Sequence, residues 1–205
     1  MACTTQLIHQ SFIQQDWPAQ KSQVPFHVLP VVWEYTKDGT ILELSEGQAI
    51  ERYLAKKFHI YGKNEWENHK VDQFFTSTDT AFNTFNSKVI PASLESRISV
   101  ANDYYKDVLS KFIAVHEEHL EKNGSNGHYV GNSITLADIK TAQFIDRVFF
   151  YALKGADEVP ISAEKTPNLW KFYETRLSIA PHRWLPSRDS RYQCLFQVVG
   201  VEISE

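Results

Sequence analysis

The sequence predicts an α+β protein in which a small domain of strands and helices precedes an all-α domain and a strand-like tail. Three observations support this fold class. Residues 28–44 are rich in β-branched residues around a turn, the middle of the chain repeats apolar residues at three- and four-residue steps, and residues 193–203 are again apolar and β-branched. We therefore expect domains at residues 1–63 and 64–187 and a tail at residues 188–205.

The composition is typical of a soluble cytoplasmic protein. The chain has 205 residues, a formal net charge of -4, and lysines and arginines scattered along its length, which leaves no footprint for nucleic acid or an anionic membrane. Its N-terminus lacks the basic start and the apolar stretch of a secretory signal. The two cysteines, Cys3 and Cys194, are expected to be free thiols in a reducing compartment.

The N-terminal domain is predicted to contain a β-hairpin and then a helix. Residues 28–34 and 41–44 have strand composition, and residues 37–40 supply the turn between them. Ser45 and Gln48 have the spacing of a capping box, which predicts that the helix begins at Ser45. The apolar face of this helix is expected to consist of Ala49, Ile50, Tyr53, Leu54 and Phe58.

The all-α domain is predicted to begin with two long antiparallel helices. Apolar residues recur at helical spacing over residues 71–89 and again over residues 101–120. Thr135, followed three residues later by Asp138, marks the start of a third helix. Thr166-Pro167 marks the start of a fourth, because threonine is a good N-cap and proline suits the first helical position.

Four short motifs occur in a specific order within residues 16–187. They are Asp16-Trp17-Pro18-Ala19-Gln20-Lys21, Pro25-Phe26 with Leu29-Pro30, Ala49-Ile50-Glu51-Arg52-Tyr53-Leu54, and Thr135-Leu136-Ala137-Asp138. Together they make a chain that resembles the cytosolic glutathione S-transferase superfamily, closest to its sigma-like members. The resemblance implies a thioredoxin-like N-terminal domain, a helical C-terminal domain, and glutathione as the ligand.

The resemblance also implies a glutathione site at the start of the hairpin. Pro30 would be cis, so that the N–H and C=O of Leu29 pair with the cysteinyl part of glutathione as an added strand would. The alternative is a trans proline that opens an edge strand. Glu46 and Gly47 match the positions that bind the γ-glutamyl group at a helix N-terminus. Because the family has a serine where this chain has Gly47, we expect weaker affinity; alternatively, residues 45–48 only cap the helix.

Three further residues are assigned to glutathione by the same resemblance. Trp17, through its indole N–H, and Lys21, through its charge, match contacts to the glycyl carboxylate. The alternative for both is a surface loop with an extended lysine. Asp79 lies beside the position from which a partner subunit's carboxylate would reach the glutathione ammonium, although that position itself falls on Thr80.

The start of the chain departs from the family pattern. Family members have a strand, a turn that carries the catalytic Tyr, Ser or Cys, and a helix before the strand that leads into the Asp16-Trp17-Pro18 loop, about thirty residues for elements of ordinary length. Residues 1–15 supply only the leading strand. We therefore expect a truncated domain with no catalytic residue, because Cys3, Thr4 and Thr5 are better explained as a frayed end.

The same departure predicts an incomplete sheet. The strand that is missing is the central one of four, so its loss leaves backbone edges unpaired. Residues 193–203 are the candidate that fills the gap, in their own subunit or in a neighbouring one. This predicts a homo-oligomer, either a dimer or a larger assembly.

Two functions remain open. The first is a self-assembling structural or scaffolding protein that has lost transferase catalysis, and the second is an active or weakly active transferase or a binder of glutathione and hydrophobic ligands.

No metal site is predicted. His116 and His119 lie three residues apart, but His116 belongs to the apolar stripe of its helix.

Overall fold

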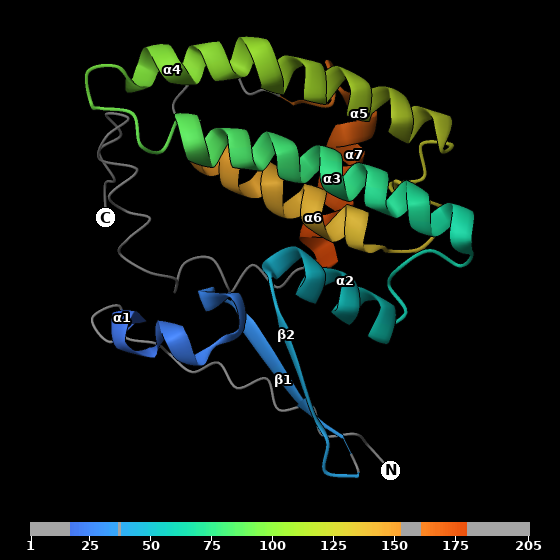
Figure 1. The fold of residues 1–205 in the computed structure, drawn as a ribbon. Helices are drawn as coiled ribbons and strands as arrows, with labels where there is room; N and C mark the ends of the chain where they lie inside the picture. The colour runs from blue at the N-terminus through green and yellow to red at the C-terminus, as the bar shows by residue number, and fades with distance from the viewer. Residues whose placement is uncertain (1–16, 37, 153–160, 180–205) are drawn as a thin grey trace. The chain divides into compact units, whose positions relative to one another are not determined.

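The computed structural model describes residues 17–36, 38–152 and 161–179 (Figure 1). Four predictions lie outside these residues: the leading strand, the frayed end at Cys3, Thr4 and Thr5, the free thiols of Cys3 and Cys194, and the strand at residues 193–203. The chain divides into two compact units, Met1–Ile60 and Tyr61–Glu205. The predicted fold class, a small α/β unit followed by a helical one, is confirmed.

The first unit is built on a hairpin. Short helical turns come first: α1 (Trp17–Gln20), η1 (Lys21–Gln23) and η2 (Pro25–His27). They are followed by strands β1 (Val31–Tyr35) and β2 (Ile41–Ser45) and by helix α2 (Gly47–Lys57). The strands are antiparallel, with Val31 opposite Ser45 and Tyr35 opposite Ile41.

The predicted turn closes the hairpin. The N–H of Thr36 donates to the C=O of Thr40 at 2.9 Å, and the Asp38 carboxylate accepts the N–H of Thr40 at 3.1 Å. Gly39 has φ 87, a value that a residue without a Cβ adopts at little cost. The Asp-Gly pair that predicted the turn therefore makes it.

Helix α2 is joined to the hairpin by an ion pair. The Glu34 carboxylate of β1 lies 2.5 Å from the Lys57 ammonium and also accepts the hydroxyl of Tyr53. These two contacts hold the pKa of Glu34 below its ordinary value. The predicted apolar face is only partly correct, because Ile50 is buried but Phe58 is 60% exposed, and the most buried residue of the helix is Ala55.

The predicted capping box at Ser45 and Gln48 is wrong. Ser45 is the last residue of β2, where it pairs with Val31, and its hydroxyl donates to the C=O of Pro25 at 3.2 Å. The N-cap of α2 is Glu46, whose side chain makes no capping hydrogen bond. The strand continues one residue further than the sequence indicated, which takes Ser45 out of reach of the helix.

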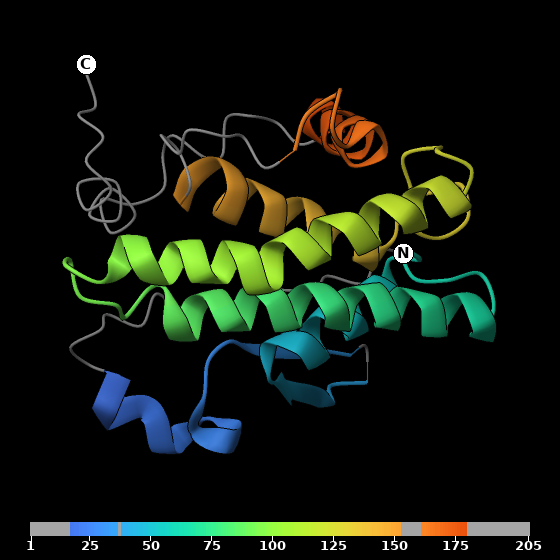
Figure 2. The ribbon, with the colours of Figure 1, turned by 90° about the horizontal axis from the view of Figure 1, so that it is seen from above.

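The second unit is entirely helical within the described residues. Helix α3 (Glu65–Lys88) is followed by a long rod made of α4 (Arg97–Tyr104), η3 (Tyr105–Leu109) and α5 (Ser110–Lys122). Figures 1 and 2 show α3 and this rod side by side and antiparallel, as predicted. Helices α6 (Leu136–Phe144) with η4 (Ile145–Ala152), and α7 (Pro167–Ile179), complete the unit. No helix in the described ranges combines the length and hydropathy that a membrane span needs.

The core of the helical unit is largely aromatic. Phe75, Phe149 and Phe172 are fully buried, and Phe112 meets Phe144 edge to face with ring centroids 4.8 Å apart. Such pairs stabilise a core beyond the area that they bury. The high aromatic content of the sequence, 13%, is therefore used in packing.

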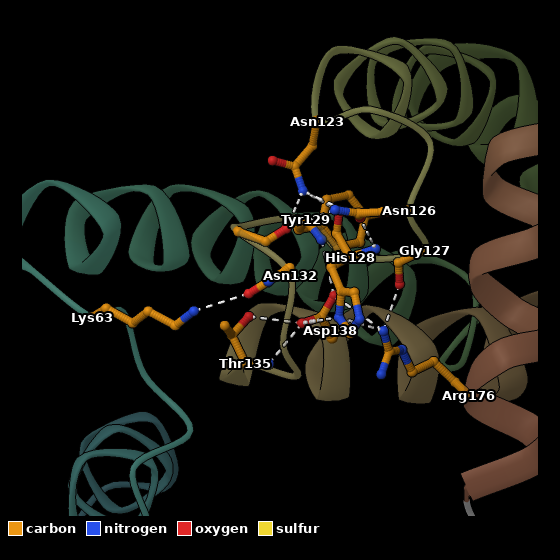
Figure 3. A network of polar contacts seen from close by, with 11 residues as sticks. Lys63, Asn123, Asn126, Gly127, His128, Tyr129, Asn132, Thr135, Asp138 and Arg176 are labelled. Atoms are coloured by element: carbon orange, nitrogen blue, oxygen red, sulfur yellow. Dashed lines mark hydrogen bonds and ion pairs between the residues drawn. The ribbon is translucent and has the colours of Figure 1, made fainter.

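The start of α6 is fixed by one buried carboxylate (Figure 3). Asp138 has no exposed surface, and its Oδ2 accepts the N–H of Thr135 at 2.7 Å and the Thr135 hydroxyl at 2.9 Å. Its Oδ1 accepts the N–H of Tyr129 at 3.0 Å. Arg176 of α7 lies 3.9 Å from the same carboxylate and donates to the C=O of Gly127 at 2.5 Å. The predicted cap at Thr135 and Asp138 is thus confirmed.

The start of α7 is bound by a carboxylate from another helix. Glu117 of α5 accepts the backbone N–H and the side-chain amide of Asn168, both at 2.8 Å, and the N–H of Leu169 at 2.7 Å. The carboxylate satisfies N–H groups that a helix leaves unpaired at its N-terminus, where the helix dipole also favours negative charge.

Replacing Glu117 by alanine is expected to lower the free energy of unfolding of the chain by about 1 to 2 kcal/mol, because two backbone donors of α7 lose a charged acceptor. Urea denaturation followed by circular dichroism measures this. The matched control is Glu121→Ala, which removes an exposed carboxylate from the same helix. Equal stability of the two variants would show that α7 does not depend on this cap.

Candidate functional site

Leu29 and Pro30 form the centre of the candidate site. The peptide bond between them is cis, as predicted. Leu29 is 43% exposed, and no described residue forms a hydrogen bond with its backbone N–H or C=O. A backbone donor and acceptor without partners in the described structure can pair with the backbone of a bound peptide.

The N-terminus of α2 lies beside Pro30. A Cβ added to Gly47 would lie 3.8 Å from Cδ of Pro30, so the structure brings Pro30 and the start of α2 together. The first N–H groups of an α-helix have no partner within the helix, so the start of α2 can bind an anion, and the helix dipole favours one there.

Glu46 precedes this helix in an unusual conformation. Its φ is 70 and its ψ is 114, a region that residues with a Cβ seldom adopt. Its side chain is exposed, and its carboxylate has no partner among the described residues. Backbone strain of this kind persists where the surrounding structure holds it, often at binding sites. An exposed carboxylate beside the N-terminus of a helix suits a ligand that carries both an ammonium and a carboxylate.

The loop before Leu29 carries the other predicted contacts of this unit. Trp17 is the first residue of α1, and Lys21 is the exposed first residue of η1. The C=O of Lys21 accepts a ring N–H of His27 at 2.9 Å, which ties η1 to η2. Phe26 and His27 both have φ 54, which the sequence did not signal because neither is glycine.

Ser45 is a residue of this site that sequence reasoning missed. It is 5% exposed, and its hydroxyl is used to hold Pro25 of η2. Through this bond β2 positions the segment that leads into Leu29. The local pattern indicated a different role, because Ser45 has the spacing of a helix cap.

Asp79 lies in the helical unit, where its carboxylate is already bound. It is 8% exposed, lies 3.2 Å from the Lys140 ammonium of α6, and accepts the Asn83 side-chain amide at 2.7 Å. Thr80, its exposed neighbour, donates its hydroxyl to the C=O of Thr76. Asp79 could contact a ligand's ammonium only by sharing or releasing Lys140.

His116 is a packed core residue. It is 1% exposed, its ring stacks on Phe112 with centroids 3.7 Å apart, and its two nitrogens bond to the hydroxyls of Ser77 and Tyr129. Burial lowers the pKa of His116 to about 3, and the neighbouring His119 adds to this effect. Among the described residues no group of three or more side chains is placed to hold a metal ion.

Comparison with known proteins gives the family. The family described as "Glutathione S-transferase, C-terminal domain" matches residues 85–180. A Dictyostelium discoideum protein that is named as a glutathione S-transferase alpha-2 is 30% identical to this chain over 168 residues. The match covers 80% of this chain and 74% of that protein. S-crystallin SL11 of Nototodarus sloanii is 28% identical over 127 residues, which cover 62% of this chain and 60% of that protein.

A solved structure shares the fold. The sigma class glutathione transferase of Fasciola hepatica superposes with a TM-score of 0.67 at 21% identity, over 91% of this chain and 80% of that chain. The sequence relatives and the shared fold lead to the same conclusion: this chain belongs to the cytosolic glutathione S-transferase superfamily.

Proposed function

We propose that this chain binds the peptide backbone of glutathione and has lost the usual means of activating its thiol. The observation that carries the proposal is the backbone of Leu29, which forms no hydrogen bond with a described residue, beside the exposed carboxylate of Glu46 and the N-terminus of α2. Each group complements one part of the tripeptide.

The binding mode follows from these groups. The cysteinyl N–H and C=O of glutathione pair with Leu29, as in the addition of a strand. The γ-glutamyl carboxylate binds at the first N–H groups of α2 beside Gly47, and its ammonium pairs with Glu46. Lys21 and Trp17 contact the glycyl carboxylate. Asp79 plays a lesser part in this proposal because Lys140 already neutralises it.

The proposed loss of catalysis rests on the lack of a suitable donor among the described residues of this site. Transferase chemistry needs a group that stabilises the glutathione thiolate and so lowers its pKa. Ser45, the hydroxyl next to Glu46 in sequence, is buried and donates to Pro25. The sequence of residues 1–15 is expected to supply only a strand, without a residue for this role.

A binding assay and a turnover assay test the proposal together. Calorimetric titration with glutathione is expected to show binding, while conjugation of a generic aromatic electrophile stays at the uncatalysed rate. Glu46→Gln and Lys21→Ala should each weaken binding about tenfold, the loss of one charged contact. The matched controls, Glu95→Gln and Lys88→Ala, change exposed charges of the helical unit. Glutathione-dependent turnover, or binding that neither site variant weakens, would refute the proposal.

Gly47→Ser is expected to strengthen glutathione binding about threefold to tenfold, because the hydroxyl adds a donor to the γ-glutamyl carboxylate. The added Cβ would meet Cδ of Pro30 at 3.8 Å, an ordinary contact, so the site can accept a serine. Calorimetry compares this variant with Ala49→Ser, which adds the same hydroxyl at an exposed position of the same helix. Unchanged or weaker binding by Gly47→Ser would place the carboxylate elsewhere.

A second candidate function is self-assembly as a structural protein. It is favoured by the relative named as an S-crystallin, which matches 62% of this chain. In this candidate the chain forms a homo-oligomer in the cytoplasm, residues 193–203 join the copies, and neither nucleic acid nor membrane is a partner. Large species by light scattering, with no glutathione binding and no turnover, would favour this function over the first.

A further inference from the structure

Strand β1 has one edge that no described residue pairs. The bond from the N–H of Thr36 to the C=O of Thr40 fixes the pattern of the ladder, because hydrogen-bonded pairs alternate along an antiparallel hairpin. By this alternation Val32 and Glu34 direct their backbone groups toward β2. Val31, Trp33 and Tyr35 direct theirs to the opposite side, where the described sheet has no further strand.

An edge of this kind can pair with a further strand. A two-stranded hairpin is marginal by itself in water, and unpaired edge groups are a template for another strand. The same hairpin also leaves apolar side chains in water: Tyr35 is 43% exposed, and Ile41 opposite it is 54% exposed. A third strand beside β1 would satisfy the backbone and cover part of this surface.

We propose that residues 193–203 of the chain add to the open edge of β1 as a third strand. The segment is Gln193-Cys194-Leu195-Phe196-Gln197-Val198-Val199-Gly200-Val201-Glu202-Ile203 and carries a single charge. Both of its alternating faces are mainly apolar, as in strands that lie inside a sheet rather than at its rim. Its valines would also lie beside Trp33 and Tyr35, and pairs of aromatic and β-branched residues stabilise neighbouring strands.

The segment suits this edge better than the other strand-like stretch of the chain. Residues 4–13, Thr-Thr-Gln-Leu-Ile-His-Gln-Ser-Phe-Ile, are polar at more than half of their positions. Residues 180–192 connect α7, which ends at Ile179, to the proposed strand. The pairing deepens the second candidate function because it names the surface that receives the segment, but it does not require that the donor be another copy.

Amide hydrogen exchange measured by NMR on the full chain tests the pairing. The amides of Val31, Trp33 and Tyr35 are expected to exchange at least about tenfold more slowly than in a chain that ends at residue 192. The amides of Val32 and Glu34, which donate toward β2, are the internal control and should stay protected in both. A synthetic peptide of residues 193–203, added to the shortened chain, should restore the protection.

Two proline variants separate the candidate occupants. Val199→Pro removes a donor from the middle of the proposed strand, and we expect it to expose the same three amides. Ile8→Pro is the matched change in residues 4–13 and should leave them protected. If the three amides exchange freely in the full chain, or if only Ile8→Pro exposes them, the proposal is wrong.

Light scattering on the same samples distinguishes the pairing of residues 193–203 with β1 from self-assembly of the chain. Protection that depends on residues 193–203 in a monomeric chain would support the pairing within one subunit and count against self-assembly. Protection that is lost on dilution together with the large species would support pairing between copies.

Discussion

Replacing Asp138 by alanine is expected to lower the free energy of unfolding of the chain by about 3 to 5 kcal/mol, the usual cost of removing one partner from a buried charged pair. The carboxylate has no exposed surface and binds two backbone N–H groups and the Thr135 hydroxyl. Without it these donors remain buried and unpaired, and Arg176, itself 5% exposed, loses its nearest negative charge.

The loss also reaches the loop that Asp138 holds (Figure 3). His128 accepts an N–H of Arg176 at 2.8 Å, while the side-chain amide of Asn123 holds the C=O of His128 and that of Gly131, each at 2.9 Å. We therefore expect the whole segment from Asn123 to the start of α6 to loosen, which hydrogen exchange would detect.

Chemical denaturation of Asp138→Ala beside Glu118→Ala measures the effect. Glu118 pairs with Lys122 on the surface of α5, with both side chains more than half exposed, so its loss should change the free energy of unfolding far less than the loss of Asp138. A loss below about 1 kcal/mol for Asp138→Ala would mean that the buried network contributes little and that packing alone fixes α6.

The free energy of unfolding is expected to fall by about 2 kcal/mol as the pH is lowered from 7 to 5, through His116 alone. The folded chain holds this imidazole neutral, with a pKa near 3, because burial disfavours the charged form. The unfolded chain takes up a proton below pH 6.5. The stability that the neutral His116 contributes is therefore complete above about pH 6.5 and is lost progressively as the pH falls toward 3.

Denaturation curves at several pH values test this, with His116→Gln as the informative variant. It should be less stable than the parent at pH 7, because it leaves Ser77 and Tyr129 with poorer partners, but its stability should decline less on acidification. His128, whose pKa burial and Arg176 also lower, accounts for a remaining decline. The control is His69→Gln on the exposed surface of α3, which should keep the parent profile. If the stability of His116→Gln declined on acidification as much as that of the parent, His116 would not be the source of the pH dependence.

The sequence predicted those elements whose signals are local. Asp38-Gly39 makes its turn, Thr135 and Asp138 make their cap, and Pro167 opens α7, because in each case the residues that decide the conformation are neighbours in the chain. The apolar position of His116 on its helical stripe also predicted its burial correctly.

The capping-box prediction failed, and other contacts were not predicted, where a distant residue decides the outcome. Ser45 has the spacing of a cap, but its pairing with Val31 keeps it in the strand and its hydroxyl is taken by Pro25. The cap of α7 comes from Glu117 on another helix, and Asp79 is bound by Lys140 of α6. No local pattern contains these partners, because they meet only when the helices pack.

The candidate site shows the same division. The cis bond before Pro30 followed from the family resemblance, and the structure contains it. The positive φ of Glu46 and the edge of β1 that no described residue pairs could not be predicted from residue types, because neither glutamate nor valine indicates such a feature.

The pKa of the glutathione thiol in its complex with the chain tests the central claim most directly. The thiolate absorbs in the ultraviolet, so a titration of the saturated complex against free glutathione reports the thiol's ionisation. We expect glutathione to bind and its thiol to keep the ordinary pKa of about 8.5, because in the proposed function no described residue of the site stabilises the thiolate. A bound thiol whose pKa is lowered by one unit or more would contradict the account, and so would a chain that does not bind glutathione at all.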